Sequence, residues 1–182
     1  TQTTSAAWFF DEWHYRASFD VFNASTTEDL VDFQVELPTS TLALSTAWTV
    51  GKLRNDFKDL RFTDSAGNLL DYWFPDATST IMSVYVKMPS MPKNATSTVM
   101  MYYGNPSAPD KRDGNNVFPD FFDDFSDGTY AAGPRPWTVN AGTYSVAGTD
   151  KYLNNVSADA ISSPSTKAYG TWEFNLYKNA DA

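Results

Sequence analysis

Asp59, Arg61 and Asp64 form the densest charged motif of the sequence. Side chains two residues apart in a β-strand point to the same side, so Asp59 and Arg61 would lie close enough for a charge-assisted hydrogen bond. One interpretation makes Arg61 a ligand-binding residue. The other makes the motif a structural ion pair that anchors the turn at residues 65–68. We favour the structural interpretation, because partly buried arginine pairs commonly fix a loop.

A second acidic group, Asp123, Asp124 and Asp127, has the chemistry of a calcium site. Ca²⁺ binds about six to eight oxygen atoms from carboxylates and carbonyls, and extracellular modules often use it. The spacing lacks the full pattern of a helix–loop–helix calcium loop, and Gly128 alone does not supply it. The alternative is that these carboxylates cap turns and face solvent. Ca²⁺ is the one cofactor that the sequence suggests.

Aromatic side chains are numerous, with 6 Trp, 10 Tyr and 13 Phe. Sugars stack their apolar faces on flat aromatic rings, while polar side chains fix their orientation. The candidates for such a carbohydrate-binding platform are Trp48, Tyr102, Tyr103 and Trp137. Core packing is the alternative for each of them, and it is the expected role of Phe62, Trp73 and Trp172.

Catalysis finds little support in the sequence. His14 is the single histidine, and no nucleophile-elbow sequence accompanies it. Paired carboxylates of the glycosidase type depend on a separation in space that the sequence does not give. No glycine-rich phosphate loop or histidine-based metal motif occurs, and cysteine is absent. We therefore expect a protein that is not an enzyme.

The composition describes a globular, acidic chain of 182 residues with a net charge of −9. Nucleic acids and anionic membranes bind clustered Lys and Arg, so neither is an expected partner. No apolar run approaches the length of a membrane-spanning helix, so we do not expect membrane insertion. The chain begins at Thr1 without Met, which suggests a mature form located outside the cell or on its surface. The candidate glycosylation sites are the sequons at Asn23, Asn94 and Asn155.

Alternating apolar and polar residues predict many short strands. The strongest patterns cover residues 17–21, 33–37, 82–88 and 169–177, with weaker ones at 60–63, 69–74 and 98–103. In the second pattern Phe33, Val35 and Leu37 share one face. Short strands joined by compact turns favour an all-β fold, an antiparallel β-sandwich of the jelly-roll kind.

A polar, turn-rich segment at residues 108–117 predicts a linker between two domains. Residues 1–10 are expected to be a leader or an exchangeable strand, and residues 11–107 the β-sandwich domain. Residues 118–182 hold four or five predicted strands, so we expect a second, smaller or incomplete β-sandwich segment. It would be a fragment of a larger sandwich, or it would complete itself against the first domain or a neighbouring subunit.

Several motifs resemble an uncharacterised domain family found in secreted, multi-domain proteins of bacteria and archaea. They cover about residues 11–107 and are Trp13-His-Tyr-Arg16, Asp59-Leu-Arg-Phe-Thr-Asp64, Asp71-Tyr-Trp73 and Met101-Tyr-Tyr-Gly-Asn105. In that family the domain often precedes a concanavalin A-like (laminin-G-like) lectin domain. Asp123-Asp-Phe125 with Gly128 and Trp137 is similar to the start of such a domain. The resemblance implies a β-sandwich, an association with carbohydrate-active or adhesive proteins, and no catalytic residues.

Two hypotheses for the function follow from these observations. A third, that the chain is a fragment of a hydrolase, is the least favoured. The first is a non-catalytic extracellular module that binds carbohydrate, a polysaccharide or a glycoprotein glycan, or mediates adhesion. The second is a structural protomer of a cell-surface or extracellular filament or layer. For the second, Trp8, Phe9 and Phe10 are apolar residues beside a polar leader. They could add as a strand to the open sheet edge of a neighbouring subunit of the same protein.

Overall fold

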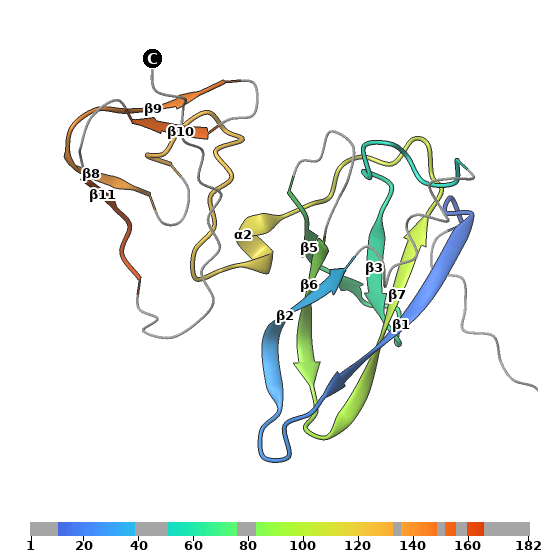
Figure 1. Ribbon diagram of the computed structural model, residues 1–182. Helices are drawn as coiled ribbons and strands as arrows, with labels where there is room; N and C mark the ends of the chain where they lie inside the picture. Colours follow the sequence, from blue (N-terminus) through green and yellow to red (C-terminus); the bar gives the residue numbers. More distant parts are fainter. Residues whose placement is uncertain are drawn as a thin grey trace, which may run out of the picture. The chain divides into compact units, whose positions relative to one another are not determined.

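The protein consists of two compact units, Thr1–Pro119 and Asp120–Ala182. The computed structural model describes residues 11–38, 51–75, 83–132, 136–148, 152–155 and 160–165 (Figure 1). Nearly all of the regular structure is strand, and every strand pair is antiparallel. The expected all-β sandwich is confirmed.

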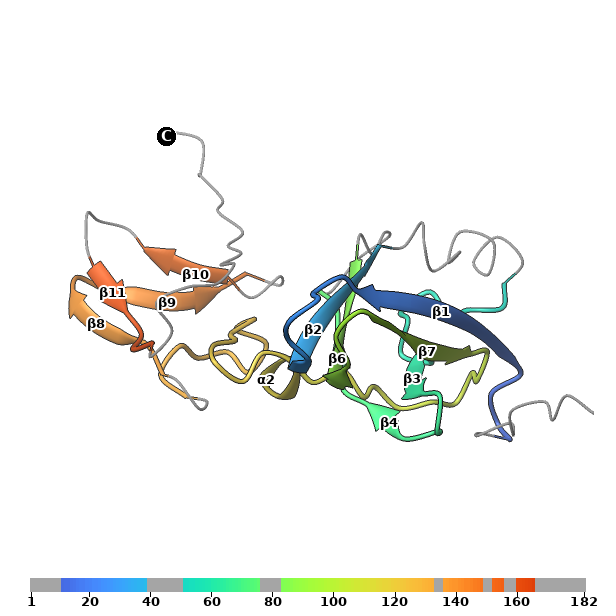
Figure 2. The same cartoon turned by 90° about the horizontal axis from the view of Figure 1, so that it is seen from below.

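The first unit contains two sheets and one short helix. Its elements are β1 (Tyr15–Asn23), β2 (Leu30–Pro38), β3 (Arg61–Asp64), β4 (Leu69–Leu70), β5 (Tyr72–Trp73), β6 (Ser83–Met91), β7 (Ala95–Tyr103) and α2 (Gly114–Val117). One sheet has the strand order β1-β7-β3-β4 and the other the order β2-β6-β5. Only Asp71 separates β4 from β5, so these two strands close one side of the sandwich. The edge strands β1 and β2 therefore lie on the other side (Figures 1 and 2).

The core lies between the two sheets and follows from the two-residue period of the strands. In β6 the side chains of Val84, Val86 and Met88 are buried, while the residues between them are half-buried. Val99 and Met101 of β7 face them from the other sheet within the same core cluster. Burying each such side chain contributes about 1.5–3 kcal/mol relative to leaving it in water. The alternation therefore fixes which face of each sheet is inside.

Strand β2 departs from its predicted alternation at one position. Val35 and Leu37 are buried, but Phe33 is 42% exposed. Asp32 has a positive φ of 51°, and the register passes from Val31 opposite Ser90 to Phe33 opposite Met88. The residue opposite Asp32 would be Pro89, which has no N–H to donate. These two residues therefore do not form a pair in the register. The register is the same on both sides of Asp32, so Phe33 lies on the face of Val35 and Leu37 as expected, but near the exposed start of the strand rather than in the core.

The segment 108–117, expected as a linker, is part of the first unit, whose boundary lies after Pro119. The side chain of Ala108 is 3% exposed and that of Val117 is fully buried. The Asp113 N–H donates to the carbonyl of Tyr72 at 3.0 Å, and Asp113 also caps α2 by accepting from the N–H of Asn116. Polar, turn-rich sequence here forms a strap that packs on the sandwich.

The second unit contains β8 (Thr138–Ala141), β9 (Tyr144–Ala147), β10 (Tyr152–Asn155) and β11 (Ala160–Ser162). They form two two-stranded sheets, β10-β9 and β11-β8. None of its described residues is fully buried. In the described ranges of the whole chain, no helix is long and apolar enough to cross a membrane.

Two glycines with positive φ offer a matched test of the fold. Gly104 follows β7 with φ +91°, and a Cβ there would lie 2.5 Å from Cδ2 of Tyr15, whose ring stacks on Tyr103. Gly51 has φ +66° and open space around it. Gly51→Ala meets only backbone strain and should cost about 1 kcal/mol. Gly104→Ala must also displace a packed ring, and we expect a loss of about 2–4 kcal/mol in urea unfolding. Equal losses would show that Tyr15 does not restrict this turn.

Candidate functional site

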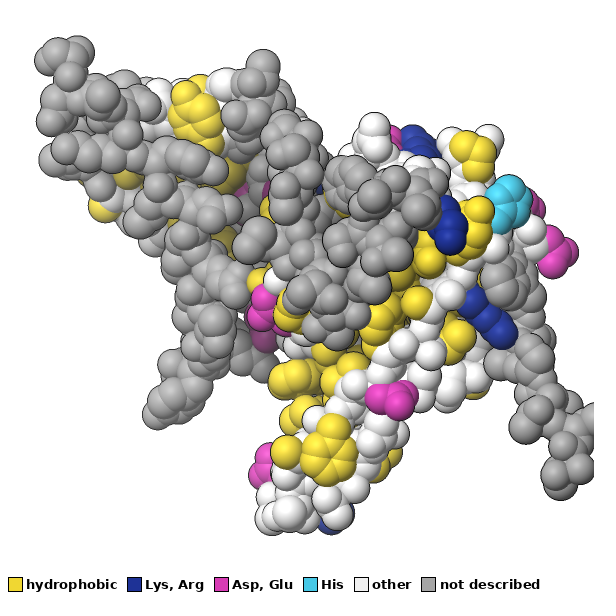
Figure 3. Space-filling model, turned by 45° about the vertical axis from the view of Figure 1, so that its right-hand side comes forward, with side chains coloured by type: hydrophobic (Ala, Val, Ile, Leu, Met, Phe, Trp, Pro, Cys, Tyr) yellow, Lys and Arg dark blue, Asp and Glu magenta, His cyan; other side chains and the backbone are white. Residues whose placement is uncertain are grey.

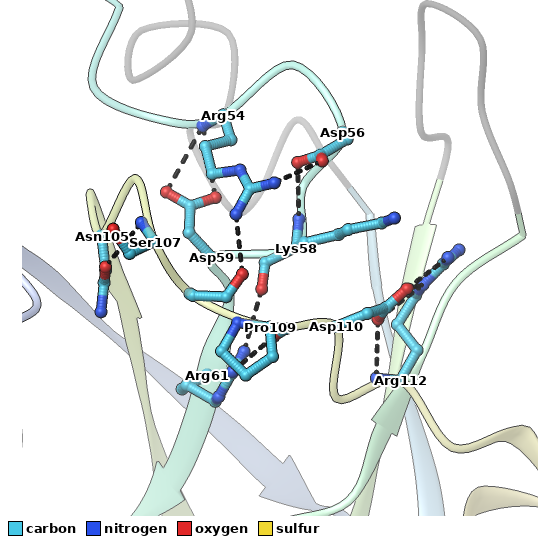
Figure 4. Close-up of polar contacts among 11 residues, drawn as sticks. Arg54, Asp56, Lys58, Asp59, Arg61, Asn105, Ser107, Pro109, Asp110 and Arg112 are labelled. Carbon is cyan, nitrogen blue, oxygen red and sulfur yellow. Dashed lines mark hydrogen bonds and ion pairs between the residues drawn. The ribbon is translucent and has the colours of Figure 1, made fainter.

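Six charged residues of the first unit form what we call the arginine–aspartate network (Figure 4). Its members are Arg54, Asp56, Asp59, Arg61, Asp110 and Arg112. They come from three parts of the chain: the loop before β3, the start of β3, and the strap that follows β7. Figure 4 shows their side chains pointing toward one another and toward backbone carbonyls.

Asp59 is fully buried and its carboxylate accepts hydrogen bonds from its own loop and from the distant end of β7. The N–H of Gly104 donates at 2.8 Å and the N–H of Arg54 at 3.2 Å. The indole N–H of Trp13 donates to the Asp59 carbonyl at 2.6 Å. Desolvation by burial raises the pKa of Asp59 above its usual value, although both backbone bonds act to lower it. One buried carboxylate therefore joins the loop before β3 to the end of β7.

Arg61 is 6% exposed and its guanidinium donates to several backbone oxygens. Nη2 donates to the Pro109 carbonyl at 2.7 Å, and Nη1 donates to the Lys58 carbonyl at 3.0 Å. Nη1 also bonds to the Leu60 carbonyl and to the hydroxyl of Tyr72. The expected partner of Arg61, Asp59, bonds elsewhere. The structure therefore corrects the predicted ion pair: both residues anchor segments, but through the backbone.

Tyr72 completes this part of the network from β5. Its hydroxyl donates to the carbonyl of Leu60 at 2.7 Å and accepts from Arg61 at 3.2 Å. Burial raises the pKa of Tyr72 to about 12, since the phenolate would be poorly solvated there. The phenol therefore remains protonated and serves as a hydrogen-bond bridge.

Of the two other arginines, Arg54 binds the strap from the loop before β3, and Arg112 lies within the strap. Arg54 Nη1 donates to the Ala108 carbonyl at 2.7 Å, and Nη2 pairs with Asp56 at 2.6 Å. Arg112 pairs with Asp110 at 2.7 Å, and its guanidinium lies 4.7 Å from the centre of the Phe74 ring. Burial acts to raise the pKa of Asp110, but the hydrogen bonds and charge of Arg112 outweigh it and lower the value.

The network is chemically saturated by the protein itself. In the described part of the chain, no buried side-chain nitrogen or oxygen lacks a hydrogen-bond partner. The donors of Arg61 that could hold an anionic ligand are directed at carbonyls of the strap and of the loop before β3. This arrangement fits a structural role for the motif, which holds the strap against the sandwich, rather than a ligand-binding role.

Asp64 anchors the turn between β3 and β4 with hydrogen bonds, and among the described residues it forms no ion pair. Oδ1 accepts from the N–H of Ala66 at 2.9 Å and of Asn68 at 2.8 Å. Oδ2 accepts from the Asn68 side chain at 2.8 Å, and Gly67 supplies the positive φ of 89° that closes the turn. Asp64 thus fixes residues 65–68 as expected, by a different interaction.

The acidic group of the second unit caps turns. Asp123, Asp124 and Asp127 each accept from the backbone N–H two residues ahead, at 2.8, 3.1 and 2.9 Å. Asp123 also accepts from the indole N–H of Trp137 at 2.8 Å, and burial raises its pKa. Across the described ranges, no three His, Cys, Asp or Glu side chains gather as metal ligands. The calcium prediction therefore gains no ligand cluster from the structure.

The rings predicted to contact sugar differ in exposure. Tyr102 is 2% exposed, so it offers no face to a ligand. Tyr103 is half-buried and stacks on Tyr15 with ring centres 5.4 Å apart. Trp137 is half-buried and its ring meets that of Phe121 edge-on at 5.1 Å. Trp48 lies outside the described residues, as do Trp8, Phe9 and Phe10.

A group of rings missed in the sequence lies on β5, β6 and the end of the strap. Trp73 was expected to be buried in the core but is half-buried, as are Tyr85 and Phe118. Phe118 is edge-on to both of the others, with ring centres 5.9 and 5.3 Å apart. Trp73 stands opposite Tyr85 in the register. The outward phase of Tyr85, between the buried Val84 and Val86, was the signal in the sequence.

Apolar side chains are also exposed on both edge strands. Phe22 on β1 is 56% exposed, and Val31 and Phe33 on β2 are 68% and 42% exposed. We call these three the exposed edge residues. In Figure 3 hydrophobic side chains gather on the lower part of the first unit, where Figure 1 places the connection from β1 to β2. Phe22 is out of phase with the inward Phe19 and Val21, so the sequence carried this signal.

The structural role of Arg61 can be tested against Arg54. Arg61→Met removes a buried donor and leaves the Pro109 carbonyl and the Tyr72 hydroxyl with fewer partners. We expect a loss of about 2–4 kcal/mol in the free energy of unfolding. Arg54→Met removes a partly exposed donor and should cost about 1 kcal/mol. Urea unfolding followed by tryptophan fluorescence measures both, and a near-neutral Arg61→Met would contradict the anchoring role.

One family model matches a part of the chain that includes most of the arginine–aspartate network. Residues 56–140 match the family described as Domain of unknown function (DUF2341), which is just under half of the chain. The match begins in the loop before β3 and ends within β8. No curated protein and no solved structure matches the chain. The likeness to an uncharacterised domain family, expected over about residues 11–107, is thus confirmed in part: the match covers residues 56–140, which include most of the network.

Proposed function

We propose that the chain is a non-catalytic module of an extracellular or cell-surface protein. In this proposal its first unit associates with neighbouring copies of the same protein through its edge strands, in a filament, a layer or an adhesive assembly. The observation that carries the proposal is the exposure of Phe22, Val31 and Phe33 on β1 and β2.

Strand β1 is suited to accept an added strand. It stands at the end of its sheet and pairs with β7 over nine consecutive residues, from Tyr15 opposite Tyr103 to Asn23 opposite Ala95. It contains no proline and no residue with positive φ. A long, regular edge strand presents a row of peptide groups that another strand can pair with. Strand β2 has the positive φ of Asp32 and ends in Pro38, which are features that protect an edge.

The exposed edge residues add an apolar contribution at one end of the sandwich. The Asn23 side chain donates to the Met91 carbonyl at 3.0 Å and to the Glu28 carbonyl at 3.2 Å. These bonds hold the end of β1 and the start of β2 together, so Phe22 and Val31 flank one connection. Removing such side chains from water contributes roughly 25 cal/mol per Å², which an interface between copies would gain.

The remaining polar groups support a role without catalysis. His14 is exposed and meets Tyr15 edge-on, with ring centres 6.4 Å apart. The buried Asp59 and Arg61 bond to backbone groups rather than to each other. Neither set forms the nucleophile, base and orienting group that covalent catalysis needs.

Carbohydrate binding is the second candidate function, and the group Trp73, Tyr85 and Phe118 favours it. Its rings are half-buried, so each keeps part of its surface in solvent. Lys87 stands two residues after Tyr85 in β6, with its ammonium group 3.1 Å from the carbonyl of Asn116. Aromatic faces with a polar group beside them are the surface that sugars bind.

Self-association can be tested with two matched serine variants. Phe22→Ser removes an exposed apolar side chain from the proposed interface, and Leu69→Ser removes one that is 60% exposed on β4, at the other edge of the same sheet. Sedimentation equilibrium over a dilution series should show association of the wild-type chain. We expect Phe22→Ser to weaken it by about tenfold or more, as for a residue central to an interface, and Leu69→Ser to leave it unchanged.

Three results bear against this proposal. A chain that stays monomeric at every concentration would contradict association through β1, and so would equal effects of the two variants. Affinity electrophoresis through polysaccharide gels then tests the second candidate. Retardation that Tyr85→Ala abolishes and Tyr15→Ala preserves would establish carbohydrate binding in its place.

A further inference from the structure

We propose that Asn94 is the attachment site of an N-linked glycan, selected by the fold from the three sequons of the chain. This inference rests on the extracellular location proposed above, and it is independent of the self-association. The chemical classes involved are an activated sugar donor and an N-glycosyltransferase. The argument comes from comparing the three asparagines in the folded chain.

Asn94 ends the tight turn between β6 and β7. Its φ is +49°, a conformation that asparagine adopts more readily than most residues. The Asn94 N–H donates to the Ser25 carbonyl at 2.8 Å, and the Lys93 N–H donates to Asp29 Oδ1 at 2.8 Å. The backbone of the turn is therefore fixed, while the side chain of Asn94 is exposed and forms no hydrogen bond with the described residues.

The residue that completes this sequon, Thr96, is exposed like Asn94, and the residue between them is half-buried. Its middle residue is Ala95, which is compatible with transfer, whereas proline would not be. Thr96, whose hydroxyl completes the sequon, is exposed and stands opposite Phe22 in the register of β1 and β7. A surface turn is the usual setting of an N-glycosylated asparagine.

Asn23 has the opposite environment. It is 4% exposed, and its Nδ2 donates to the carbonyls of Glu28 and Met91. Its Oδ1 accepts from the N–H of Ser25, whose hydroxyl in turn accepts from the N–H of Glu28 at 3.0 Å. A sugar on Nδ2 would replace one of these bonds and require space inside the sandwich. The folded chain therefore excludes a glycan at Asn23.

Asn155 lies between these two cases. It is exposed but belongs to strand β10, and its Nδ2 donates to the hydroxyl of Tyr144, the residue opposite it on β9, at 3.3 Å. Ser157, which completes its sequon, lies outside the described residues. Transfer at Asn155 would compete with a cross-strand hydrogen bond, which Asn94 does not have to break.

The transfer itself needs no group of this chain beyond the sequon. Nδ2 of Asn94 forms a bond to the anomeric carbon of the donor sugar, and the bond from that carbon to the donor phosphate oxygen breaks. The diphosphate carrier leaves with the bonding electrons, and the Nδ2 proton passes to a base of the transferase. No oxidation or reduction occurs, so the donor is the only co-reactant.

The test uses the whole chain in two preparations. The first is secreted from a eukaryotic host that N-glycosylates its secreted proteins. The second is purified folded from a host without this pathway and incubated with a soluble N-glucosyltransferase and UDP-glucose. Peptide mapping by mass spectrometry measures the occupancy of each sequon. We expect Asn94 to be the main occupied site in both, with Asn23 unmodified in the folded preparation.

Two variants and two controls make the result specific. Asn94→Gln and Thr96→Ala should each abolish the modification, while Thr96→Ser and Asn155→Gln should preserve it. Thr96→Ala retains the asparagine and its turn, so it separates loss of the sequon from a change of fold. An unmodified Asn94 beside a fully glycosylated reference protein would overturn the inference, as would higher occupancy at Asn23 or Asn155. Sedimentation of the unglycosylated chain reports self-association separately, so failure of one proposal does not imply failure of the other.

Discussion

Asp59 is the only acidic side chain that is fully buried among the described residues, and much of the first unit is arranged around it. A carboxylate placed in an apolar interior loses several kcal/mol of solvation unless hydrogen bonds replace the lost water. Here the replacement comes from backbone N–H groups of Arg54 and Gly104, and the residue's own carbonyl accepts from Trp13. The loop before β3 and the end of β7 must therefore come together before this charge is satisfied, and Trp13 adds a bond to the backbone of the same residue.

Arg61 extends the same constraint to the strap. Its donors reach the carbonyl of Pro109, while Arg54 reaches that of Ala108, so two consecutive carbonyls are held by two arginines. The strap then brings Phe118 beside Trp73 and Tyr85. The arginine–aspartate network, whose charged residues could suggest a binding site in the sequence, thus stabilises the loop before β3 and the strap. Two surfaces remain for recognition. One is the group of Trp73, Tyr85 and Phe118, which the strap helps to position, and the other is formed by the edge strands β1 and β2.

Local pattern in the sequence predicts what depends on neighbouring residues. The alternation of Val84, Val86 and Met88 identified β6 and its buried face. The charged motif was expected to anchor the turn after β3 by an ion pair, and Asp64 holds this turn by hydrogen bonds instead. The failures involve partners far apart in the chain. Asp59 and Arg61 face different partners, 45 and 48 residues away, which spacing within one strand cannot reveal. Phe33 keeps the register of the buried Val35 and Leu37 but lies near the exposed start of β2, and alternation alone does not show where along a strand the core ends.

The central claim is that the buried carboxylate of Asp59 holds these segments in the folded state. Amide hydrogen exchange of the native chain tests it most directly. The N–H groups of Arg54 and Gly104, which bond to Asp59, should exchange only through unfolding of the whole first unit, as the core amides of β6 do. The N–H of Ala66, bonded to the less buried Asp64, should exchange much faster. Exchange of Arg54 and Gly104 as fast as that of Ala66 would contradict the account.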